Sequence, residues 1–465
     1  MKTSKICKLN IDKTYGVHYL KTTIASIIIA GLIIILQPLD MSIDQSIILA
    51  ALLVTIVLWT TNVISKSYAS VFLLVAFMVF GKTPIRQIFS FPLSENFVMI
   101  VFSFIFSQGI AKSKLADKLI QPVLFKYANT LLKFFISLFA IQFLMIFIIP
   151  QPFSRVIIIA MIFLAYFERI NLRHETKEIM LFWIYVSSAL INMIIIRGDI
   201  ILNNALITIA NHTINESVWI KYMSIPSIMM YIIAAMGFAY TFKNHIWEFE
   251  VNRFENSTKD IKLNSQENKQ LLVISLTVLF WAAESIHGIN GTIVVIIGSM
   301  AMFVIGLLKI EDLKSINIHL LVFLTAAFSI GGVLKGSGVS DIIFLRFVPL
   351  FPEVFSTGYI AIIMITAASL HMILGSAVTT MSVVVPGLLI IASGQAGTEI
   401  LMFIMYIMIC SHFVLPFHNV ILMIGNGNKH FRAELMLRYA PVLTGTVVFG
   451  IFIVYLNWWR LIGVL

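Results

Sequence analysis

Apolar segments long enough to cross a lipid bilayer recur along nearly the whole sequence, and this repetition restricts the fold more than any other feature. A helix needs roughly 20 apolar residues to cross a hydrocarbon core of about 30 Å. Hydrophobic residues make up 59% of the 465 residues, whereas charged residues make up only 12%. Such a chain cannot cover a water-soluble surface, and its polar links are too short for a sizeable soluble domain. The sequence therefore predicts an all-α polytopic membrane protein.

About eleven transmembrane helices are expected from the lengths of the apolar segments. They lie near residues 21–38, 46–64, 68–81, 95–111, 178–208, 224–242, 269–285, 292–308, 319–335, 399–427 and 440–458. The basic N-terminal tail resembles a signal peptide in outline, but no small-residue cleavage site follows it. We therefore expect the first span to be retained.

Two further apolar segments, residues 130–168 and 357–394, are too long for a single crossing. Each is interrupted midway by proline or glycine together with small polar residues, at 149–155 and at 374–380. Non-helical backbone at membrane depth is tolerated only where protein or a wet cavity surrounds it. Both segments are therefore predicted to be re-entrant helical hairpins.

The distribution of Lys and Arg predicts the orientation of the chain. Most of the 32 basic residues fall in links that share one side of the membrane when the N-terminus is cytoplasmic. Because cytoplasmic loops are enriched in Lys and Arg, we expect a multi-pass protein of the inner cell membrane with its C-terminus outside. The net charge of +10 then reflects topology, and no nucleic-acid partner is expected. The basic residues expected outside are Lys82, Arg86, Lys221, Lys335, Arg346 and Arg460.

The two halves of the chain resemble each other weakly. Trp59 recurs as Trp281 and Ser154 recurs as Ser376, at the same separation. Each half would contain five spans and one hairpin, and an odd number of crossings inverts the second half relative to the first. Chance similarity between apolar helices is the alternative, but the shared separation argues against it. The predicted domains are an N-terminal tail with the first helix (1–40), a first inverted repeat (41–242), a cytoplasmic linker (243–268) and a second inverted repeat (269–465).

Several segments resemble the divalent anion/sodium symporter family of the ion transporter superfamily. They are the segments around Trp59 and Trp281, the helix at 321–332, the two hairpins, and the broken helix at 415–419. The resemblance covers nearly the whole chain after the first span. It implies secondary transport of dicarboxylates, citrate or sulfate by alternating access, and a homodimer in which a transport region moves against a scaffold.

The hairpin tips depart from the pattern of that family, in which each tip usually carries Ser-Asn-Thr, whose oxygens help to bind sodium and the substrate carboxylate. Here the first tip reads Gln-Pro-Phe-Ser-Arg at 151–155, and the second reads Ser-Ala-Val-Thr-Thr at 376–380. Only Ser376 keeps the expected residue type at its position. The resemblance implies sodium as the coupling ion, and the departures predict that transport depends weakly on sodium and more on pH or a counter-anion.

Two arginines are expected at membrane depth, where a charge is costly unless it is paired or hydrated and therefore usually has a function. Arg155 lies at the first tip, and Arg197 with Gly198 interrupts the apolar helix at 179–210. We expect Arg197 to neutralise the bound anion, with Asp199 holding its guanidinium. The alternatives are a purely structural ion pair between Arg197 and Asp199, and snorkelling of Arg155 to the surface.

A second helix break, at 415–419, occupies the matching place in the second repeat. Half-helix N-termini there would direct N–H groups at an anion, and freed carbonyls could hold a cation. His418 could serve proton coupling or act as a hydrogen-bonded staple of the helix. The hydroxyls of Ser376, Thr379 and Thr380 could donate to a carboxylate or bond back to their own helix. The predicted substrate-binding residues are Ser154, Arg155, Arg197, Gly198, Ser376, Thr379, Thr380, Pro416, His418 and Asn419.

Other functions fit the sequence less well. A cation/proton antiporter, or another efflux permease of the same superfamily, is the main alternative, and an antiporter needs a buried acid such as Asp199. A membrane-embedded enzyme would need convergent acids, histidines or a metal cluster, and neither such spacing nor a cysteine pair appears. We expect no enzymatic activity and no cofactor apart from a coupling ion, sodium or proton.

Overall fold

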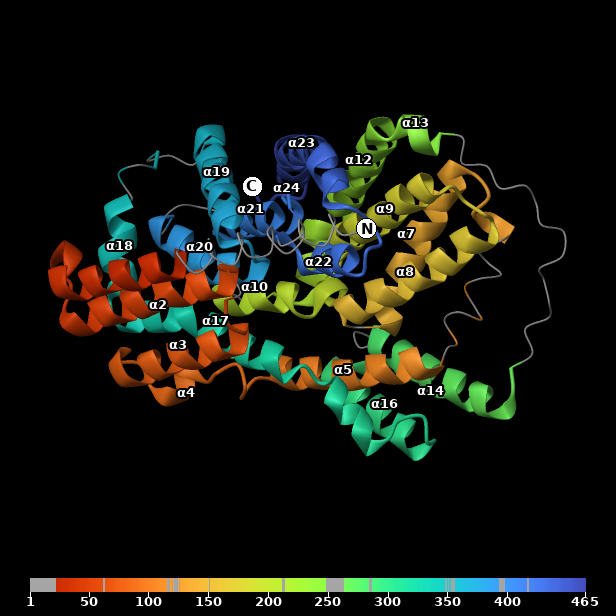
Figure 1. Cartoon of the computed structure of the whole chain (residues 1–465), viewed down its shortest axis with the longest axis horizontal. Coiled ribbons are helices and arrows are strands. Elements are labelled where there is room, and N and C mark those ends of the chain that lie inside the picture. Colours follow the sequence, from red (N-terminus) through yellow and green to blue (C-terminus); the bar gives the residue numbers. More distant parts are fainter. Residues whose placement is uncertain are drawn as a thin grey trace, which may run out of the picture. The chain divides into compact units, whose positions relative to one another are not determined.

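The structure of the protein, a computed structural model, describes residues 22–465 with several short gaps. The described residues are almost entirely helical and contain no β-strand (Figure 1). The predicted all-α fold is therefore confirmed. The gaps are residues 62, 114, 116–117, 119, 121–123, 125, 150, 211–213, 248–262, 284–286, 348, 350, 353–355, 393–397 and 416–417.

Helices occur at the predicted spans. Five helices of the described part are long and apolar enough to cross a membrane, judged by length and composition alone. The five are Glu95–Ser113, Leu131–Ile148, Glu216–Thr241, Ile318–Gly336 and Ala433–Leu461. Shorter apolar helices are Thr22–Leu36, Ile43–Trp59, Lys66–Phe80, Gly291–Val304, Thr357–Met372, Ala377–Ile391 and Glu399–Ser411. The number of crossings and the depth of the hairpins stay predictions.

The chain divides into two compact units, each of which draws on segments far apart in the sequence. Unit 1 comprises Met1–Ser94, Thr208–Ala210 and Asn317–Met405. Unit 2 comprises Glu95–Ile207, Asn211–Ile316 and Tyr406–Leu465. The predicted domains follow the inverted repeats, and their boundaries stay a prediction.

Unit 1 is built around α17 (Ile318–Gly336), which packs against α3 (Lys66–Phe80) and α20 (Ala377–Ile391). Trp59 fixes the end of a neighbouring helix, because its indole Nε1 donates to Ser70 Oγ at 3.1 Å. The remaining helices of the unit are α2 (Ile43–Thr61) on α3, and α18 (Val339–Phe347) and α19 (Thr357–Leu374) on α20.

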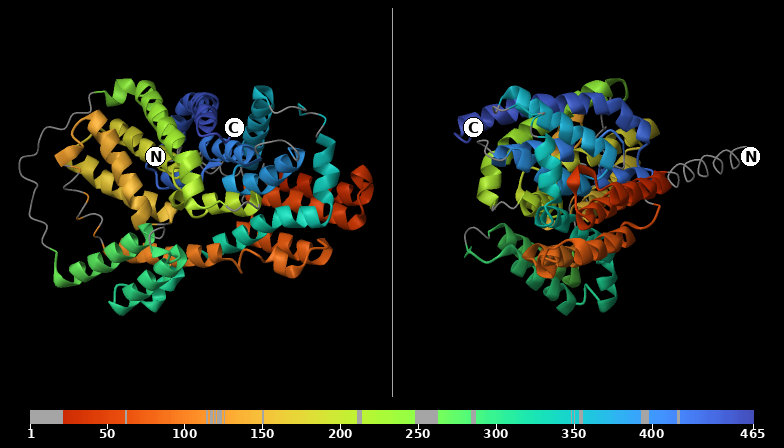
Figure 2. Two further views of the ribbon diagram at one scale, coloured as in Figure 1. Left: turned by 180° about the vertical axis from the view of Figure 1, so that it is seen from behind. Right: turned by 90° about the vertical axis from the view of Figure 1, so that its left-hand side faces the viewer.

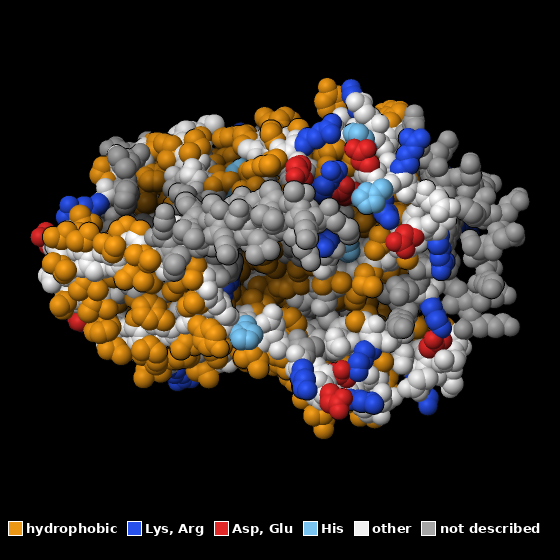
Figure 3. Space-filling model, viewed as in Figure 1, with side chains coloured by type: hydrophobic (Ala, Val, Ile, Leu, Met, Phe, Trp, Pro, Cys, Tyr) orange, Lys and Arg blue, Asp and Glu red, His pale blue; other side chains and the backbone are white. Residues whose placement is uncertain are grey.

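One face of α3 is apolar and exposed. Tyr68, Val75 and Val79 are 67%, 48% and 65% exposed, and they recur at the spacing of one helical face. The opposite face buries Leu73 and Phe77. Exposed apolar surface of this extent is typical of contact with lipid. In Figure 3 the surface of α2 and α3 is correspondingly dominated by hydrophobic side chains.

The core of unit 2 is α9 (His174–Ile191), in which every side chain from Glu178 to Ile191 is buried. A helix that is covered on all sides forms the centre of its unit. Trp183 of α9 packs on Phe238, with ring centroids 4.8 Å apart, and Phe238 in turn meets Tyr439 at 5.5 Å. The helices around α9 are α7 (Leu131–Ile148), α8 (Pro152–Arg169), α12 (Ile225–Thr241) and α22 (Val420–Gly427).

A second group of helices in unit 2 consists of α5 (Glu95–Ser113), α14 (Ser265–Ala282) and α16 (Gly291–Val304), which pack on one another (Figure 2). The start of α14 is defined by a capping box. Asn264 Oδ1 accepts from the backbone N–H of Glu267 at 2.7 Å, and Glu267 Oε2 accepts from that of Asn264 at 2.9 Å. This reciprocal pair satisfies two N–H groups that a helix start leaves without partners.

The helices are interrupted where the sequence predicts. The two hairpins are α7 with α8 and α19 with α20, and the two arms of each hairpin contact one another. Two further helices are broken: α9 is followed by a single turn (η2, Ile196–Asp199) and α10 (Leu202–Ala210), and α21 (Thr398–Ser411) is followed by α22. Within unit 2, the interruptions of α7 and α8, of α9 and of α21 bring polar side chains together.

Candidate functional site

The first helix break, residues 192–201 of unit 2, exposes backbone carbonyls that neighbouring side chains then satisfy. Asn203 Nδ2 donates to the carbonyls of Asn192, Ile195 and Ile196 at 3.0, 3.1 and 3.0 Å. The indole of Trp219 donates to the Met193 carbonyl at 3.0 Å. Ser224 Oγ reaches the next carbonyl, that of residue 194, at 2.6 Å. Protein donors thus replace the water that membrane depth excludes.

Gly198 allows the broken chain to fold back on itself. A Cβ atom at this position would collide with the backbone of Asn192. Only glycine permits such a close approach of two backbone segments. The Gly198 carbonyl accepts a hydrogen bond from Arg155, which comes from the first hairpin. The predicted site residues Arg155 and Gly198 are therefore in direct contact.

Arg155 lies near the start of α8 and points into the protein. The helix begins at Pro152, and the side chain of Gln151 accepts from the backbone N–H of Ser154. The Arg155 side chain is 3% exposed, and Nη1 donates to the Ile149 carbonyl at 2.8 Å while Nη2 donates to Asn192 Oδ1 at 2.7 Å. The alternative of snorkelling to the surface is wrong for Arg155, because its hydrogen bonds run toward the helix break.

Arg197 has a different partner from the one predicted. Its Nη1 donates to the Trp281 carbonyl, its guanidinium lies 5.3 Å from the centre of the Trp281 ring, and its Nε is 3.6 Å from Glu216 Oε2. Glu216 also accepts from the backbone N–H of Ile196 at 3.1 Å. The expectation that Asp199 holds this guanidinium is therefore corrected: Glu216 lies beside it instead.

Asp199 has a different role because of its place at the start of α10. Its Oδ1 accepts from the backbone N–H groups of Ile201 and Leu202, both at 2.9 Å. This is the geometry of a helix N-cap, and it turns the carboxylate toward the restarting helix. Asp199 is 1% exposed and interacts electrostatically with Arg155.

The second break, between α21 and α22, is closed by His418 and Asn419. His418 Nδ1 accepts from the backbone N–H groups of Val414 and Leu415 at 3.2 and 3.3 Å. Asn419 Oδ1 accepts from Ile421 N–H at 2.9 Å and starts α22. His418 thus makes the contacts of a helix staple, and proton coupling through it stays a prediction. Pro416 lies outside the described residues.

The two breaks lie side by side within unit 2. Ser411, the last residue of α21, donates from Oγ to the sulfur of Met193 at 3.2 Å. The Tyr406 hydroxyl donates to Asn203 Oδ1, the same side chain whose amide satisfies the carbonyls of the first break. The Trp219 and Tyr406 rings meet edge-on with centroids 5.5 Å apart. The sequence indicated neither this crossing nor the polar residues Asn203 and Glu216, because their contacts depend on how the chain folds back at the first break.

The second hairpin tip, in unit 1, is a tight turn. Gly375 has φ +63°, a left-handed conformation that ends α19 without the steric cost of a side chain. Thr380 Oγ1 donates back to the Ser376 carbonyl at 2.8 Å and contacts His371 Nδ1 at 3.1 Å. Thr379 Oγ1 is buried and has no hydrogen-bond partner among the described residues. At this tip Thr379 is thus better placed than Thr380 to donate to a ligand.

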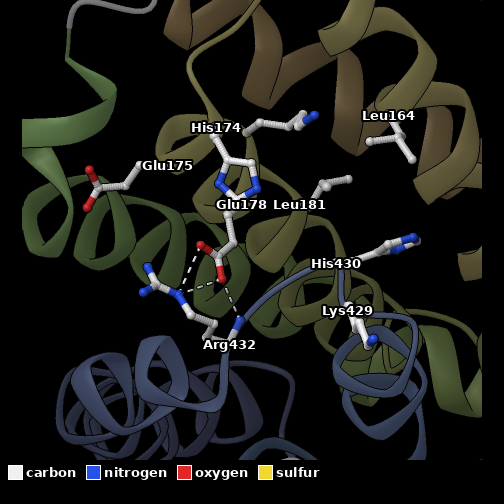
Figure 4. Close-up of a pocket in the computed structure, with 9 residues that line it drawn as sticks. Leu164, His174, Glu175, Glu178, Leu181, Lys429, His430 and Arg432 are labelled. Atoms are coloured by element: carbon white, nitrogen blue, oxygen red, sulfur yellow. Dashed lines mark hydrogen bonds and ion pairs between the residues drawn. The ribbon is translucent and has the colours of Figure 1, made fainter. Parts of the chain in front are cut away.

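A polar pocket of about 650 Å³ lies at the start of α9, where His174 and Glu178 face Lys429, His430 and Arg432 from the loop after α22 (Figure 4). Arg432 Nε donates to Glu178 at 2.9 Å, which raises the pKa of Arg432, and burial lowers the pKa of His430. The pocket carries charges of both signs, with Lys177, Lys429 and Arg432 beside Glu175 and Glu178.

Comparison with known proteins identifies the family of the chain. The profile described as sodium:sulfate symporter transmembrane region matches residues 17–465, almost the whole sequence. A comparison with curated proteins finds no match. The broken helices, the apolar outer surface and this match agree, and the chain belongs to the sodium:sulfate symporter family, whose members are secondary transporters of anions.

Proposed function

We propose that the protein moves a small divalent anion, a dicarboxylate or a sulfate-like ion, across the cell membrane by alternating access. The observation that carries the proposal is Arg197 at the first helix break, with a side chain that is 11% exposed. A dianion in a medium of low dielectric constant needs compensating positive charge, and a helix N-terminus supplies only about half a unit. Membership of an anion-transporting family supports the same function.

Arg197 is the proposed anion-binding group, and its neighbours set its position. The Trp281 carbonyl and ring fix one side of the guanidinium, and Glu216 lies beside Nε. A guanidinium can bind a carboxylate or sulfate through two parallel hydrogen bonds, which an ammonium group cannot do. Ser154, His418 and Asn419 in unit 2, and Ser376, Thr379 and Thr380 in unit 1, remain proposed site residues.

We propose that sodium has a minor role in coupling. The carbonyls of the first break accept hydrogen bonds from Asn203, Trp219 and Ser224, so a sodium ion would have to compete with these donors. The tips lack the asparagine expected for sodium binding. Proton coupling or exchange against an internal anion would then drive transport.

The membrane arrangement is part of the proposal. We propose that the protein is a homodimer in the inner membrane, with inverted repeats, a cytoplasmic N-terminus and an external C-terminus, in line with the distribution of Lys and Arg. Cation/proton antiport remains the second candidate, since Asp199 is a deeply buried acid.

Proteoliposomes test the function directly. Labelled succinate, malate, citrate and sulfate are offered separately, with a sodium gradient, with a pH gradient, and with unlabelled anion inside. We expect uptake of at least one dianion, stimulated most by the pH gradient or by internal anion. Absence of uptake for all four anions, together with cation-dependent proton movement, would favour the antiporter.

A further inference from the structure

The proposed function does not explain why Arg155 is so completely enclosed. Its guanidinium lies between two interruptions of the chain, the first hairpin tip at 149–151 and the first helix break at 192–199. A positive charge that is 3% exposed is costly in a membrane protein unless its surroundings are arranged to hold it. The side chains and carbonyls around Arg155 provide such an arrangement.

The guanidinium donates to oxygen atoms at three positions, called the oxygen cage below. These are the carbonyl of Ile149 at 2.8 Å, Oδ1 of Asn192 at 2.7 Å and the carbonyl of Gly198. The buried carboxylate of Asp199 follows Gly198 directly in the chain and supplies a negative charge next to the cage. Backbone carbonyls, amide oxygens and carboxylates are the ligands that hard metal cations prefer. The cage therefore has the ligands of a cation site. The cation that fills it is the Arg155 guanidinium, which is part of the chain.

The positions of these oxygens explain what the charge holds together. Ile149 follows α7, Asn192 caps the end of α9, and Gly198 lies in the turn before α10. Oxygen dipoles directed at one point, with a carboxylate close by, repel each other unless a cation lies between them. Without positive charge there, the tip of the first hairpin and the first break would be pushed apart.

We propose that Arg155 acts as a tethered cation, which fills the oxygen cage in place of a soluble monovalent cation and keeps the first hairpin tip attached to the first break throughout transport. Arg155 is then a positioning residue and does not bind the anion itself. Because a tethered cation cannot dissociate, this cage contributes nothing to ion coupling. Only the statement about ion coupling rests on the proposed function. The cage itself can be tested without any transport assay.

The decisive experiment measures the thermal stability of purified protein in detergent, without substrate, in chloride salts of choline, potassium, sodium and guanidinium at matched ionic strength. Wild type should unfold at the same temperature in all four salts. Arg155→Gln, which keeps an amide but loses the charge, should be less stable in choline. Low concentrations of sodium or guanidinium should raise its unfolding temperature by about 2 °C or more, as expected for a cation that binds only the folded state.

Two further variants keep the test decisive if Arg155→Gln fails to fold. Arg155→Lys retains the charge and should fold and remain insensitive to the salts. The double variant Arg155→Gln with Asp199→Asn removes the unbalanced carboxylate but keeps an N-cap at residue 199, so it should recover folding. Arg432→Gln is the matched control, because the Arg432 side chain is 63% exposed, so water and bulk ions can replace its charge and no salt-specific effect is expected.

The salt dependence of the unfolding temperature distinguishes two roles of Arg155. As a tethered cation it acts through its charge, whereas as a staple it would act only through its hydrogen bonds. The proposal is overturned if Arg155→Gln is stable and indifferent to sodium and guanidinium, or if it fails to fold and Asp199→Asn does not restore folding. None of these measurements involves substrate. The tethered cation can therefore be overturned while the wild type still takes up an anion, and it can be supported while no anion is taken up.

Discussion

Arg155 donates a hydrogen bond of 2.7 Å to the side chain of Asn192, and this contact joins the start of α8 to the end of α9. The backbone carbonyl of Asn192 in turn accepts from Asn203 Nδ2 at 3.0 Å. The connected groups are helix ends, where backbone groups lack partners within their own helix. We therefore expect the first hairpin tip and the first helix break to move as one body.

Neutralising Arg197 should abolish anion binding while the protein still inserts and folds. Arg197→Gln removes the charge that balances the dianion, and Arg197→Lys should keep partial transport because it retains the charge but loses the two-pronged geometry. Binding of the labelled substrate identified in the uptake assay provides the measurement. Wild-type affinity in Arg197→Gln would show that the residue is only half of an ion pair with Glu216.

The interaction between Glu216 and Arg197 should affect affinity more than folding. Glu216→Gln removes a negative charge near the guanidinium but can still accept from the backbone N–H of Ile196. Loss of an ion pair of this kind costs about 1 kcal/mol, so we expect a misplaced guanidinium to lower substrate affinity roughly 5-fold with little change in unfolding temperature. Unchanged affinity would exclude a positioning role for Glu216.

Sodium should have a shallow effect on uptake at fixed pH and voltage. The departures at both tips remove side chains expected to bind sodium, and the Asn192 and Met193 carbonyls of the first break already accept hydrogen bonds from Asn203 and Trp219. Initial rates of uptake are measured over a range of sodium concentrations, with choline as the replacement ion. A steep, cooperative dependence on sodium would contradict this prediction.

Asn203→Ala should destabilise unit 2 strongly. The substitution removes one donor from the carbonyls of Asn192, Ile195 and Ile196, and Ile195 still accepts from the Gly198 N–H at 2.9 Å. Each unsatisfied buried group costs about 1–3 kcal/mol, so we expect a loss of about 2 kcal/mol or more in the free energy of unfolding. Tyr406→Phe removes only the hydroxyl that donates to Asn203 and serves as the milder control. Equal unfolding temperatures for the two variants would contradict the role of Asn203 as the donor to the carbonyls of the first break.

The stability contributed by Asp312 should disappear at low pH. The Lys112 ammonium donates to Asp312 Oδ2 at 2.6 Å and lowers the pKa of this carboxyl below its unfolded value. A lowered folded pKa stabilises the protein above the unfolded pKa, and the contribution is lost as pH falls through the folded pKa. The unfolding temperatures of wild type and Asp312→Asn should therefore differ above about pH 5 and converge only as the pH falls below about 3.9, the unfolded value, and through the lower folded pKa. A gap that stays constant down to the lowest pH would show that charge is not involved.

The sequence alone determined the class of fold and the places where helices are interrupted. Apolar segments of spanning length leave the backbone no alternative to helix in a membrane, because every polar group must be satisfied within the segment. Proline and glycine then marked the interruptions, and the breaks at Gly198 and Gly375 lie where these residues predicted them. The fold class and the interruptions could be predicted because each depends on residues that are close together in the sequence.

The contacts between side chains at the interruptions depend on the packing of distant segments and could not be predicted from the sequence. The sequence suggested that Arg197 pairs with Asp199, two residues away, whereas Asp199 caps α10 and Glu216 lies beside Arg197. The backbone conformation at a helix start fixes where a capping side chain points, so closeness in sequence does not give contact. Arg155 could not be distinguished from a snorkelling residue until Asn192 was placed beside it, because a buried charge is stable only where distant segments supply its partners.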